Sequence, residues 1–549
     1  MAESAAHVRS FNIASKLERQ AALRPFQRGV VFPEGRDAQG NVRWTHLSFQ
    51  DLNQRADEYA RGFEAAGIRQ GDRVSLLVKP CLEFIPLVFA IFKIGALPVL
   101  IDPGMGRKPF LACIEAIAPR ALIAEPIVMV LKGLFGRSFS SVEIPITVGR
   151  STWWWGGRTL SDCRVAGEAP FEAFEAQRDD EAAILFTSGS TGPAKGVTYT
   201  HGIFDAQTRH IQQMYDIQPG EVDLACFPLF GLFSMAMGMT VVIPDMDPTK
   251  PAQADPDKLV EAIQTQGCTS AFGSPAIWKN VALRCRERGT TLPSLRRILM
   301  AGAPVPVWMH EAFGEILTQG AELHTPYGAT ESLPVASIGS NEVLSDTQAR
   351  TRVGGGSCVG RPAPGIDLSI IRISDAPIAE WSDTLQLSAG EIGEICVRGE
   401  VVTHEYKNAP EHTVAAKIQR GQEVCHRIGD LGYLDDQGRL WFCGRKSHRV
   451  KTADGDEMYT VPCEAIFNEH PDVYRSALVG VDGAPVIVVE LEPEAKTSKA
   501  VLTEELLALG RANPLTCAIE RVRFHPAFPV DVRHNAKIHR GELARWAAR

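Results

Sequence analysis

The chain has 549 residues, of which 45% are hydrophobic and 22% are charged, a balance that excludes a disordered or fibrous protein. The formal net charge is -8, and no run of Lys or Arg occurs, so neither nucleic acid nor an anionic membrane is an obvious partner. Because a single hydrophobic core rarely exceeds about 300 residues, we expect one large or composite domain and at least one more.

The 12 cysteines include no CxxC pair and no His/Cys cluster at zinc-ligand spacing, so we expect reduced and mostly buried thiols. The N-terminal segment lacks the apolar core of a secretory signal, and we expect a cytoplasmic protein. The longest apolar stretch, residues 85–101, contains Lys93, Gly95 and two prolines. This composition favours a buried helix that runs into a strand over a membrane span.

In the first part of the chain, short β-branched runs alternate with helical patterns. Strands are predicted at 73–78 and 97–101, and helices at 49–67, where Gly67 is a stop signal, and at 80–94. This alternation predicts α/β layers. After about residue 340, short strands separated by Gly-rich turns such as Gly354-Gly355-Gly356 predict a β-rich subdomain.

The last 100 residues or so have strand and helix signals of their own, and their number suits a small domain. We therefore predict a large N-terminal domain of residues 1–446, made of α/β layers with the β-rich subdomain. A small mobile α+β domain of residues 447–549 follows, with the boundary near Ser447.

A loop rich in glycine and hydroxyl residues follows the strand pattern near residue 186 and reads TSGSTGPAKG, residues 187–196. Its glycines allow the backbone to curve around phosphate, while N–H, hydroxyl and ammonium groups can face the anion. It is not a Walker A loop, because Lys195 is followed by Gly196 instead of Ser or Thr. Taken alone, such a loop is usually only a flexible connection.

The amino-acid sequence of this loop resembles the signature of the adenylate-forming superfamily, which includes acyl-CoA synthetases, luciferases and peptide-synthetase adenylation domains. Further motifs resemble those of the family in the same order along nearly the whole chain. They are residues 89–99 with Asp102-Pro103, residues 301–304, residues 327–331, residues 357–362, residues 429–432, Gly444-Arg445, and residues 536–540.

The resemblance implies that ATP and Mg²⁺ are used, and it assigns roles to individual residues. Glu331 is a hard oxygen ligand suited to Mg²⁺, and Thr330 can hydrogen-bond the α-phosphate. Lys537 would place a positive charge between the carboxylate and the α-phosphate as charge develops. The implied catalytic residues are Lys537, Thr330, Glu331 and Lys195, and the implied nucleotide-binding residues are Thr187, Ser188, Gly189, Ser190, Thr191, Gly192, Gly302, Ala303, Pro304, Tyr327, Gly328, Asp430 and Arg445.

In such enzymes a carboxylate oxygen attacks the α-phosphorus of ATP and pyrophosphate leaves. The resemblance further implies that residues 1–446 bind ATP and the acyl group, and that residues 447–549 form a lid that rotates about Ser447. This rotation would exchange Lys537 for a second half-reaction, in which the nucleophile is coenzyme A in most members.

Three departures from the acyl-CoA ligase pattern concern the substrate. Gly231 stands where many relatives carry His, which predicts a wider acyl pocket. Ser447 replaces the usual hinge Asp or Lys, and the loop 451–457 is longer and more acidic. Carboxylates are unfavourable beside a tunnel for a phosphorylated thiol. The alternative is that these loops vary freely.

The segments 241–251 and 324–335 resemble the β-lactone synthetases of bacterial long-chain olefin biosynthesis. This implies a 2-alkyl-3-hydroxy fatty acid whose own hydroxyl attacks the adenylate, with other enzymes of an olefin pathway as possible partners. The alternatives are a medium- or long-chain acyl-CoA ligase and a catalytically silent binding protein. The catalytically silent alternative is disfavoured because the implied site residues are all present, namely Lys195, Glu331, Asp430, Arg445 and Lys537.

Overall fold

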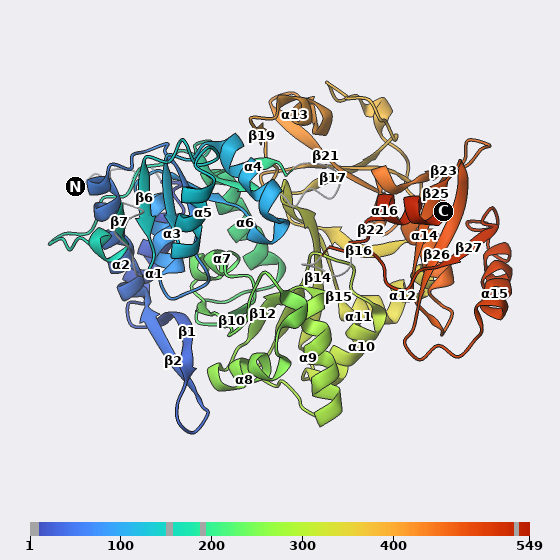
Figure 1. The fold of residues 1–549 in the computed structure, drawn as a ribbon, viewed down its shortest axis with the longest axis horizontal. Helices are drawn as coiled ribbons and strands as arrows, with labels where there is room; N and C mark the ends of the chain where they lie inside the picture. Colours follow the sequence, from blue (N-terminus) through green and yellow to red (C-terminus); the bar gives the residue numbers. More distant parts are fainter. Residues whose placement is uncertain (1–9, 150–156, 187–193, 532–536) are drawn as a thin grey trace, which may run out of the picture.

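A computed structural model of the chain describes residues 10–149, 157–186, 194–531 and 537–549. The predicted phosphate-binding positions 187–192 and the run Trp153-Trp154-Trp155 therefore lie outside the described residues. The molecule is elongated, with N-terminal elements at one end, the C-terminal elements at the other, and the strands β14, β15 and β16 between them (Figure 1).

One sheet of eight described strands forms the N-terminal end of the molecule. Its inner strands are parallel, whereas β9 pairs antiparallel with β8 and with β19. In spatial order the strands are β19 (Tyr406–Lys407), β9 (Gly196–Thr200), β8 (Glu181–Phe186), β4 (Leu97–Leu100), β3 (Arg73–Leu77), β5 (Ala121–Ala124), β6 (Ile144–Thr147) and β7 (Arg158–Thr159).

A second, larger sheet runs through the centre of the molecule and changes character along its length. In spatial order, the neighbouring strands between β1 and β14 are mostly parallel, and those between β15 and β22 are antiparallel. The antiparallel part confirms the predicted β-rich region. In this order the strands are β17 (Asp367–Ile371), β18 (Gly393–Arg398), β21 (Glu423–Leu434), β22 (Leu440–Arg445), β16 (Ser357–Pro362), β15 (Ser332–Gly339), β14 (Glu322–Ala329), β13 (Arg297–Met300), β12 (Ser270–Gly273), β10 (Val222–Ala225), β11 (Thr240–Val242), β1 (Arg28–Arg36) and β2 (Val42–Ser48), with β20 (Lys417–Arg420) beside β21.

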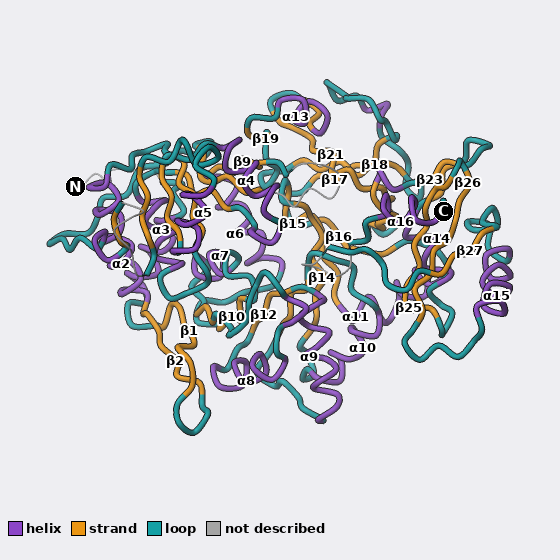
Figure 2. Tube along the Cα trace, in the orientation of Figure 1, coloured by secondary structure: helices purple, strands orange, loops and turns teal. Residues whose placement is uncertain are grey.

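Helices cover these sheets, as the purple and orange tubes of Figure 2 show. Together with the mixed sheets they confirm the predicted α/β class. In chain order they are α1 (Ala14–Leu23), α2 (Phe49–Ala66), α3 (Phe84–Lys93), α4 (Arg107–Ile117), α5 (Pro126–Leu134), α6 (His201–Met214), α7 (Gly231–Ala236), α8 (Pro256–Gln266), α9 (Pro275–Arg288), α10 (Val307–Ile316), α11 (Ser340–Glu342), α12 (Gln348–Arg352) and α13 (Pro410–Ala416).

The predicted N-terminal helices agree with the structure apart from one boundary. Helix α2 is capped by Ser48 and ends before Gly67, whose φ of 98° is left-handed and suits glycine. Helix α3 starts at Phe84 and not at residue 80, because the preceding residues form a turn in which Glu83 is held by Arg55 and Tyr59.

The long apolar stretch is a core element, as expected. It comprises α3 and β4, and Lys93 is buried there with its Nζ 2.7 Å from Asp57 and 2.6 Å from Glu18. Among the described residues, no helix is long and apolar enough to cross a membrane. The predicted thiols are also observed: all 12 cysteines are unpaired and most are buried.

The C-terminal segment has a separate sheet and separate apolar clusters. The sheet contains β25 (Val473–Val481), β26 (Ala484–Leu491) and β27 (Arg521–Phe524), and it packs with α14 (Thr460–Phe467), α15 (Lys499–Arg511) and α16 (Arg540–Ala547). A small hairpin, β23 (Val450–Lys451) and β24 (Glu457–Met458), precedes them. The exposed Ser447 lies in the single turn Lys446–His448 that joins β22 to this hairpin.

Candidate functional site

The tight turn between β14 and β15 carries Thr330 and Glu331, and both backbone carbonyls are tied down. The Tyr199 hydroxyl donates to the Thr330 carbonyl at 2.5 Å, and the Thr403 amide donates to the Glu331 carbonyl at 2.9 Å. Gly328 is required here, because a Cβ would lie 2.8 Å from the Ser332 carbonyl oxygen. The turn is therefore held from both sides.

The Glu331 carboxylate is positioned by a tyrosine that the sequence motifs do not include. The Tyr406 hydroxyl donates to Glu331 Oε1 at 2.6 Å, and burial together with Glu331 raises the pKa of Tyr406, so that it stays a proton donor. Because β19 pairs with β9, Tyr406 also meets Lys195, whose Nζ lies 5.2 Å from its ring centroid. Two predicted site residues, Glu331 and Lys195, are thus joined through Tyr406.

A second cluster surrounds Asp430, which faces Arg445 across β21 and β22. Arg445 Nε lies 3.0 Å from Asp430 Oδ1, and the Tyr327 hydroxyl donates to Oδ2 at 2.6 Å. Burial raises the pKa of Asp430, while Arg445 and the Tyr327 hydrogen bond oppose this shift. Although Oδ1 lies in ion-pair contact with Arg445, it receives no well-directed hydrogen bond from the described residues, so this buried oxygen can accept one from a ligand hydroxyl.

Lys537 reaches this second cluster from the C-terminal segment. Burial, Arg445 and Tyr327 have the largest effects on the pKa of Asp430. The positive charge of Lys537 has a smaller effect, which acts to lower the pKa of that carboxyl. The Lys537 carbonyl accepts a hydrogen bond from the Asp531 amide, beside the bridge that pairs Val530 with Ile538. Downstream, Arg540 anchors the segment through its Nη2, 2.9 Å from Glu464 Oε2.

The predicted nucleotide-binding turn at residues 301–304 follows the carboxyl end of the parallel strand β13. Gly302 has a φ of 95°, which favours glycine, and Ala303 and Pro304 follow it in a half-exposed loop. Ligands of α/β sheets bind beyond the carboxyl ends of strands, so this location suits a nucleotide.

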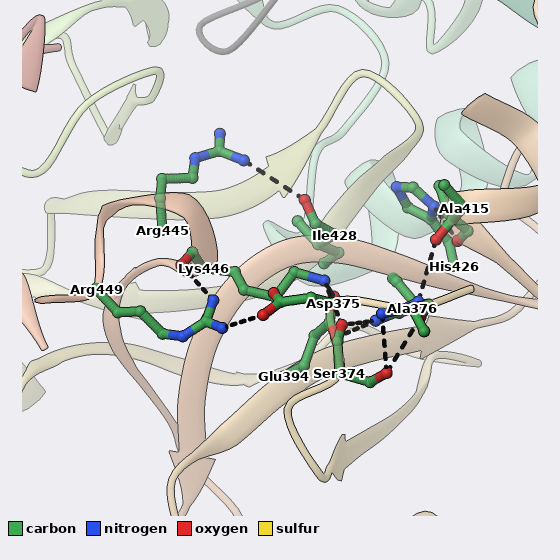
Figure 3. A network of polar contacts seen from close by, with 12 residues as sticks. Ser374, Asp375, Ala376, Glu394, Ala415, His426, Ile428, Arg445, Lys446 and Arg449 are labelled. Atoms are coloured by element: carbon green, nitrogen blue, oxygen red, sulfur yellow. Dashed lines mark hydrogen bonds and ion pairs between the residues drawn. The ribbon is translucent and has the colours of Figure 1, made fainter. Parts of the chain in front are cut away.

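The residues around the predicted hinge are anchored to the β-rich part (Figure 3). Lys446 Nζ lies 2.9 Å from both the Ser374 carbonyl and Glu394 Oε1, and Arg449 Nη2 lies 2.6 Å from Asp375 Oδ2. In the acidic loop, Asp454 and Asp456 are exposed, whereas Glu457 lies 2.9 Å from Arg449 and 3.5 Å from Lys451. The loop is therefore partly neutralised.

The expectation that Gly231 widens the acyl pocket is wrong. A Cβ at this position would lie 2.8 Å from Val241 Cγ1 and 3.5 Å from Ala225 Cβ. The space that a side chain would need is therefore filled by residues of the core strands and is not open. Gly231 begins α7 and lets this helix pack closely on β10 and β11.

Sequence reasoning missed Tyr406, Thr403 and Lys417, which lie directly behind Glu331. Thr403 Oγ1 donates to the Glu331 carbonyl at 3.1 Å, and Lys417 Nζ donates to the Thr403 carbonyl. Their distance from Glu331 along the chain left no short-range signal by which they could be found.

Together, a carboxylate and a lysine that both contact Tyr406, and a buried aspartate paired with an arginine, suit a magnesium-bound nucleotide. The chain belongs to the AMP-binding enzymes, since the model of that family matches residues 17–407.

Similar proteins agree with this class over the full length of the chain. The chain is 45% identical to an olefin beta-lactone synthetase of Xanthomonas campestris pv. campestris, across 98% of this chain and 97% of that one. It is 44% identical to an olefin beta-lactone synthetase of Stenotrophomonas maltophilia, across 98% of both chains. Its fold matches ATP-bound MatB from Rhodopseudomonas palustris with a TM-score of 0.78, at 21% identity, across 98% of this chain and 99% of that one.

Proposed function

We propose that this protein activates a 2-alkyl-3-hydroxy fatty acid with ATP as the acyl-AMP and then closes it to a β-lactone, in long-chain olefin biosynthesis. The observation that carries the proposal is the full-length similarity to two olefin beta-lactone synthetases, at 45% and 44% identity. The clusters around Glu331 and Asp430 supply groups suited to the first step.

In the first step, a carboxylate oxygen of the acid attacks the α-phosphorus of ATP, and pyrophosphate leaves. Lys195 and residues 187–192 hold the phosphates, and Thr330 contacts the α-phosphate. Gly302, Ala303, Pro304, Tyr327 and Gly328 surround the adenine. Asp430 and Arg445 bind the ribose hydroxyls, which suits an aspartate oxygen that accepts no hydrogen bond from the described residues. Lys537 balances the charge that develops, so positioning and electrostatics supply the catalysis.

We assign Mg²⁺ to Glu331. Its Oε1 is occupied by Tyr406, and among the described residues no cation pairs with the carboxylate and no group of three or more metal-binding side chains occurs. Mg²⁺ commonly uses one or two carboxylates together with phosphate oxygens and water, so a single glutamate fits. The ion would neutralise charge on the phosphates.

In the second step, the 3-hydroxyl oxygen attacks the acyl carbon, the bond from that carbon to the AMP oxygen breaks, and AMP leaves. The hydroxyl proton is lost to a base that we do not assign. An attached nucleophile needs no thiol and gains a large effective molarity, which helps to offset the strain of the four-membered ring.

We further propose that residues 1–446 bind ATP and the acyl chain, and that residues 447–549 are a mobile lid that carries Lys537. The separate C-terminal sheet and apolar clusters support this division, as does the exposed turn at Ser447. We place the protein in the cytoplasm with other enzymes of an olefin pathway, in keeping with its unpaired and mostly buried thiols.

One assay tests the reaction. The protein is incubated with ATP, Mg²⁺ and a 2-alkyl-3-hydroxy acid, with and without coenzyme A, and the products are identified by mass spectrometry. We expect AMP and a product that has lost one water relative to the acid, without any need for coenzyme A. The matched acid without the 3-hydroxyl should stop at the acyl-AMP. A thioester formed only with coenzyme A, and no dehydrated product without it, would identify an acyl-CoA ligase instead.

A further inference from the structure

Lys417, the first residue of β20, is a buried lysine that pairs with no carboxylate among the described residues. Only 8% of the residue is exposed. Its Nζ donates to the Thr403 carbonyl and lies 3.3 Å from Thr403 Oγ1, and no described carboxylate lies within 4.0 Å of it. Burying an ammonium group without a counter-ion is costly, so such a group calls for an explanation.

Two other lysines of the same protein show the ordinary solution. Lys93, which is 1% exposed, lies within 2.7 Å of both Asp57 and Glu18. Lys407, the residue after Tyr406, pairs with Glu181. Both lysines are therefore neutralised by the protein itself, whereas Lys417 is not.

The position of Lys417 indicates the kind of anion that could lie near it. Its Nζ lies 6.0 Å from the ring centroid of Tyr406, which hydrogen-bonds Glu331 and whose ring lies 5.2 Å from Lys195 Nζ. Thr403, which accepts from Lys417, donates to the Glu331 backbone. Lys417 therefore lies directly behind the residues that we assign to the phosphates and to Mg²⁺.

None of the other titratable groups described nearby forms an ion pair with Lys417. Burial lowers the pKa of Lys417 to about 7, and Glu331 opposes the shift without forming an ion pair. His426, the register partner of Lys417 in β21, is kept neutral because burial and then Lys417 lower its pKa. Among the described residues, Glu331, Tyr406 and His426 are the charged and titratable groups that interact with Lys417. Lys195 acts on His426, and the ring of His412 on α13 lies 6.5 Å from that of Tyr406.

We propose that Lys417 is a positioning residue for bound triphosphate, which takes up a proton from solvent when the anion binds beside Lys195 and Glu331. The proton returns to solvent when pyrophosphate leaves. The charged lysine then holds Thr403, and through it the Glu331 turn, against the phosphates. This inference rests on the ATP-binding part of the proposed function and not on lactone formation.

The test is calorimetric titration of the full-length protein with ATP and Mg²⁺ in the absence of any acid, so that no adenylate can form. Repeating the titration in buffers with different ionisation enthalpies gives the number of protons taken up. Since a group with a pKa near 7 is about nine-tenths neutral at pH 8, we expect uptake approaching one proton there and much less at pH 6.

Variants test whether Lys417, and not another group, takes up the proton. Lys417→Met should lose the uptake at pH 8 and bind ATP roughly 10-fold more weakly, the order expected for one charge-assisted hydrogen bond. Lys417→Arg should restore much of the affinity without proton uptake, because arginine stays charged. The matched control Lys407→Met should retain the uptake.

Three results would overturn the inference. Equal uptake in Lys417→Met and wild type would exclude Lys417 as the acceptor. Wild-type uptake that does not increase from pH 6 to pH 8 would overturn it without any variant, even if Lys417→Met fails to fold. These two results would leave the proposed use of ATP unaffected. The third result, no binding of ATP at all, would overturn the proposed use of ATP as well.

Discussion

Gly231→Ala tests whether this glycine serves core packing or pocket width. The added Cβ would meet Val241 Cγ1 at 2.8 Å, about 1 Å inside the usual optimum of 3.5 to 4.0 Å for carbon atoms. Val241 is fully buried in β11, between β10 and β1, so it has little room to move. Overpacking of this kind costs about 1–3 kcal/mol, while alanine gains up to about 1 kcal/mol in helix propensity. The difference is a net loss of about 0–3 kcal/mol in the free energy of unfolding, and we expect about 1–2 kcal/mol, the middle of that range.

The steric cost between the added Cβ and Val241 can be measured as a coupling energy. Urea-induced unfolding is followed for Gly231→Ala, for Val241→Ala and for the double variant. Val241→Ala should destabilise the protein through the cavity it leaves, yet adding Gly231→Ala to it should cost nothing further. Gly133→Ala is the matched control, because Gly133 lies in α5 and its Cβ would meet no atom within 4 Å. That control should be neutral or slightly stabilising.

The reasoning would be refuted if Gly231→Ala were as stable as Gly133→Ala, or if its cost were unchanged in the Val241→Ala background. Substrate preference provides a second measurement. If Gly231 lined the acyl pocket, Gly231→Ala would change the preferred chain length without loss of stability. We expect the opposite: a loss of stability with the same preferred chain length.

Three further predictions concern the site. Lys537→Ala should lower AMP formation by about 100-fold or more, whereas Lys496→Ala, which removes an exposed lysine of the same segment, should not; equal rates would exclude the assigned role. Tyr406→Phe removes the 2.6 Å hydrogen bond to Glu331 and should raise the KM for Mg²⁺-ATP by roughly 10-fold or more, so an unchanged KM across a Mg²⁺ titration would contradict the assignment. Asp430→Asn should weaken ATP binding by about 10-fold or more in calorimetry, with circular dichroism unchanged; wild-type affinity would exclude the ribose contact.

Short-range patterns in the sequence determined much of the fold. The apolar stripe and Gly67 defined α2 to within one residue, because helix periodicity and a left-handed stop are local properties. The start of α3 was predicted too early, because Glu83 contacts Arg55 and Tyr59 on α2, 28 and 24 residues earlier, beyond the reach of a local pattern.

The same division applies to the site. The sequence by itself determined the nucleotide motifs around Glu331, Asp430 and Lys537, since each consists of neighbouring residues. Only the tertiary structure decided that Tyr406 holds Glu331 and that Lys417 is buried with no carboxylate partner in the described part of the chain. It also decided that Gly231 faces a core strand. Burial and pairing are set by whichever distant element packs against a residue, and a linear pattern does not contain that information.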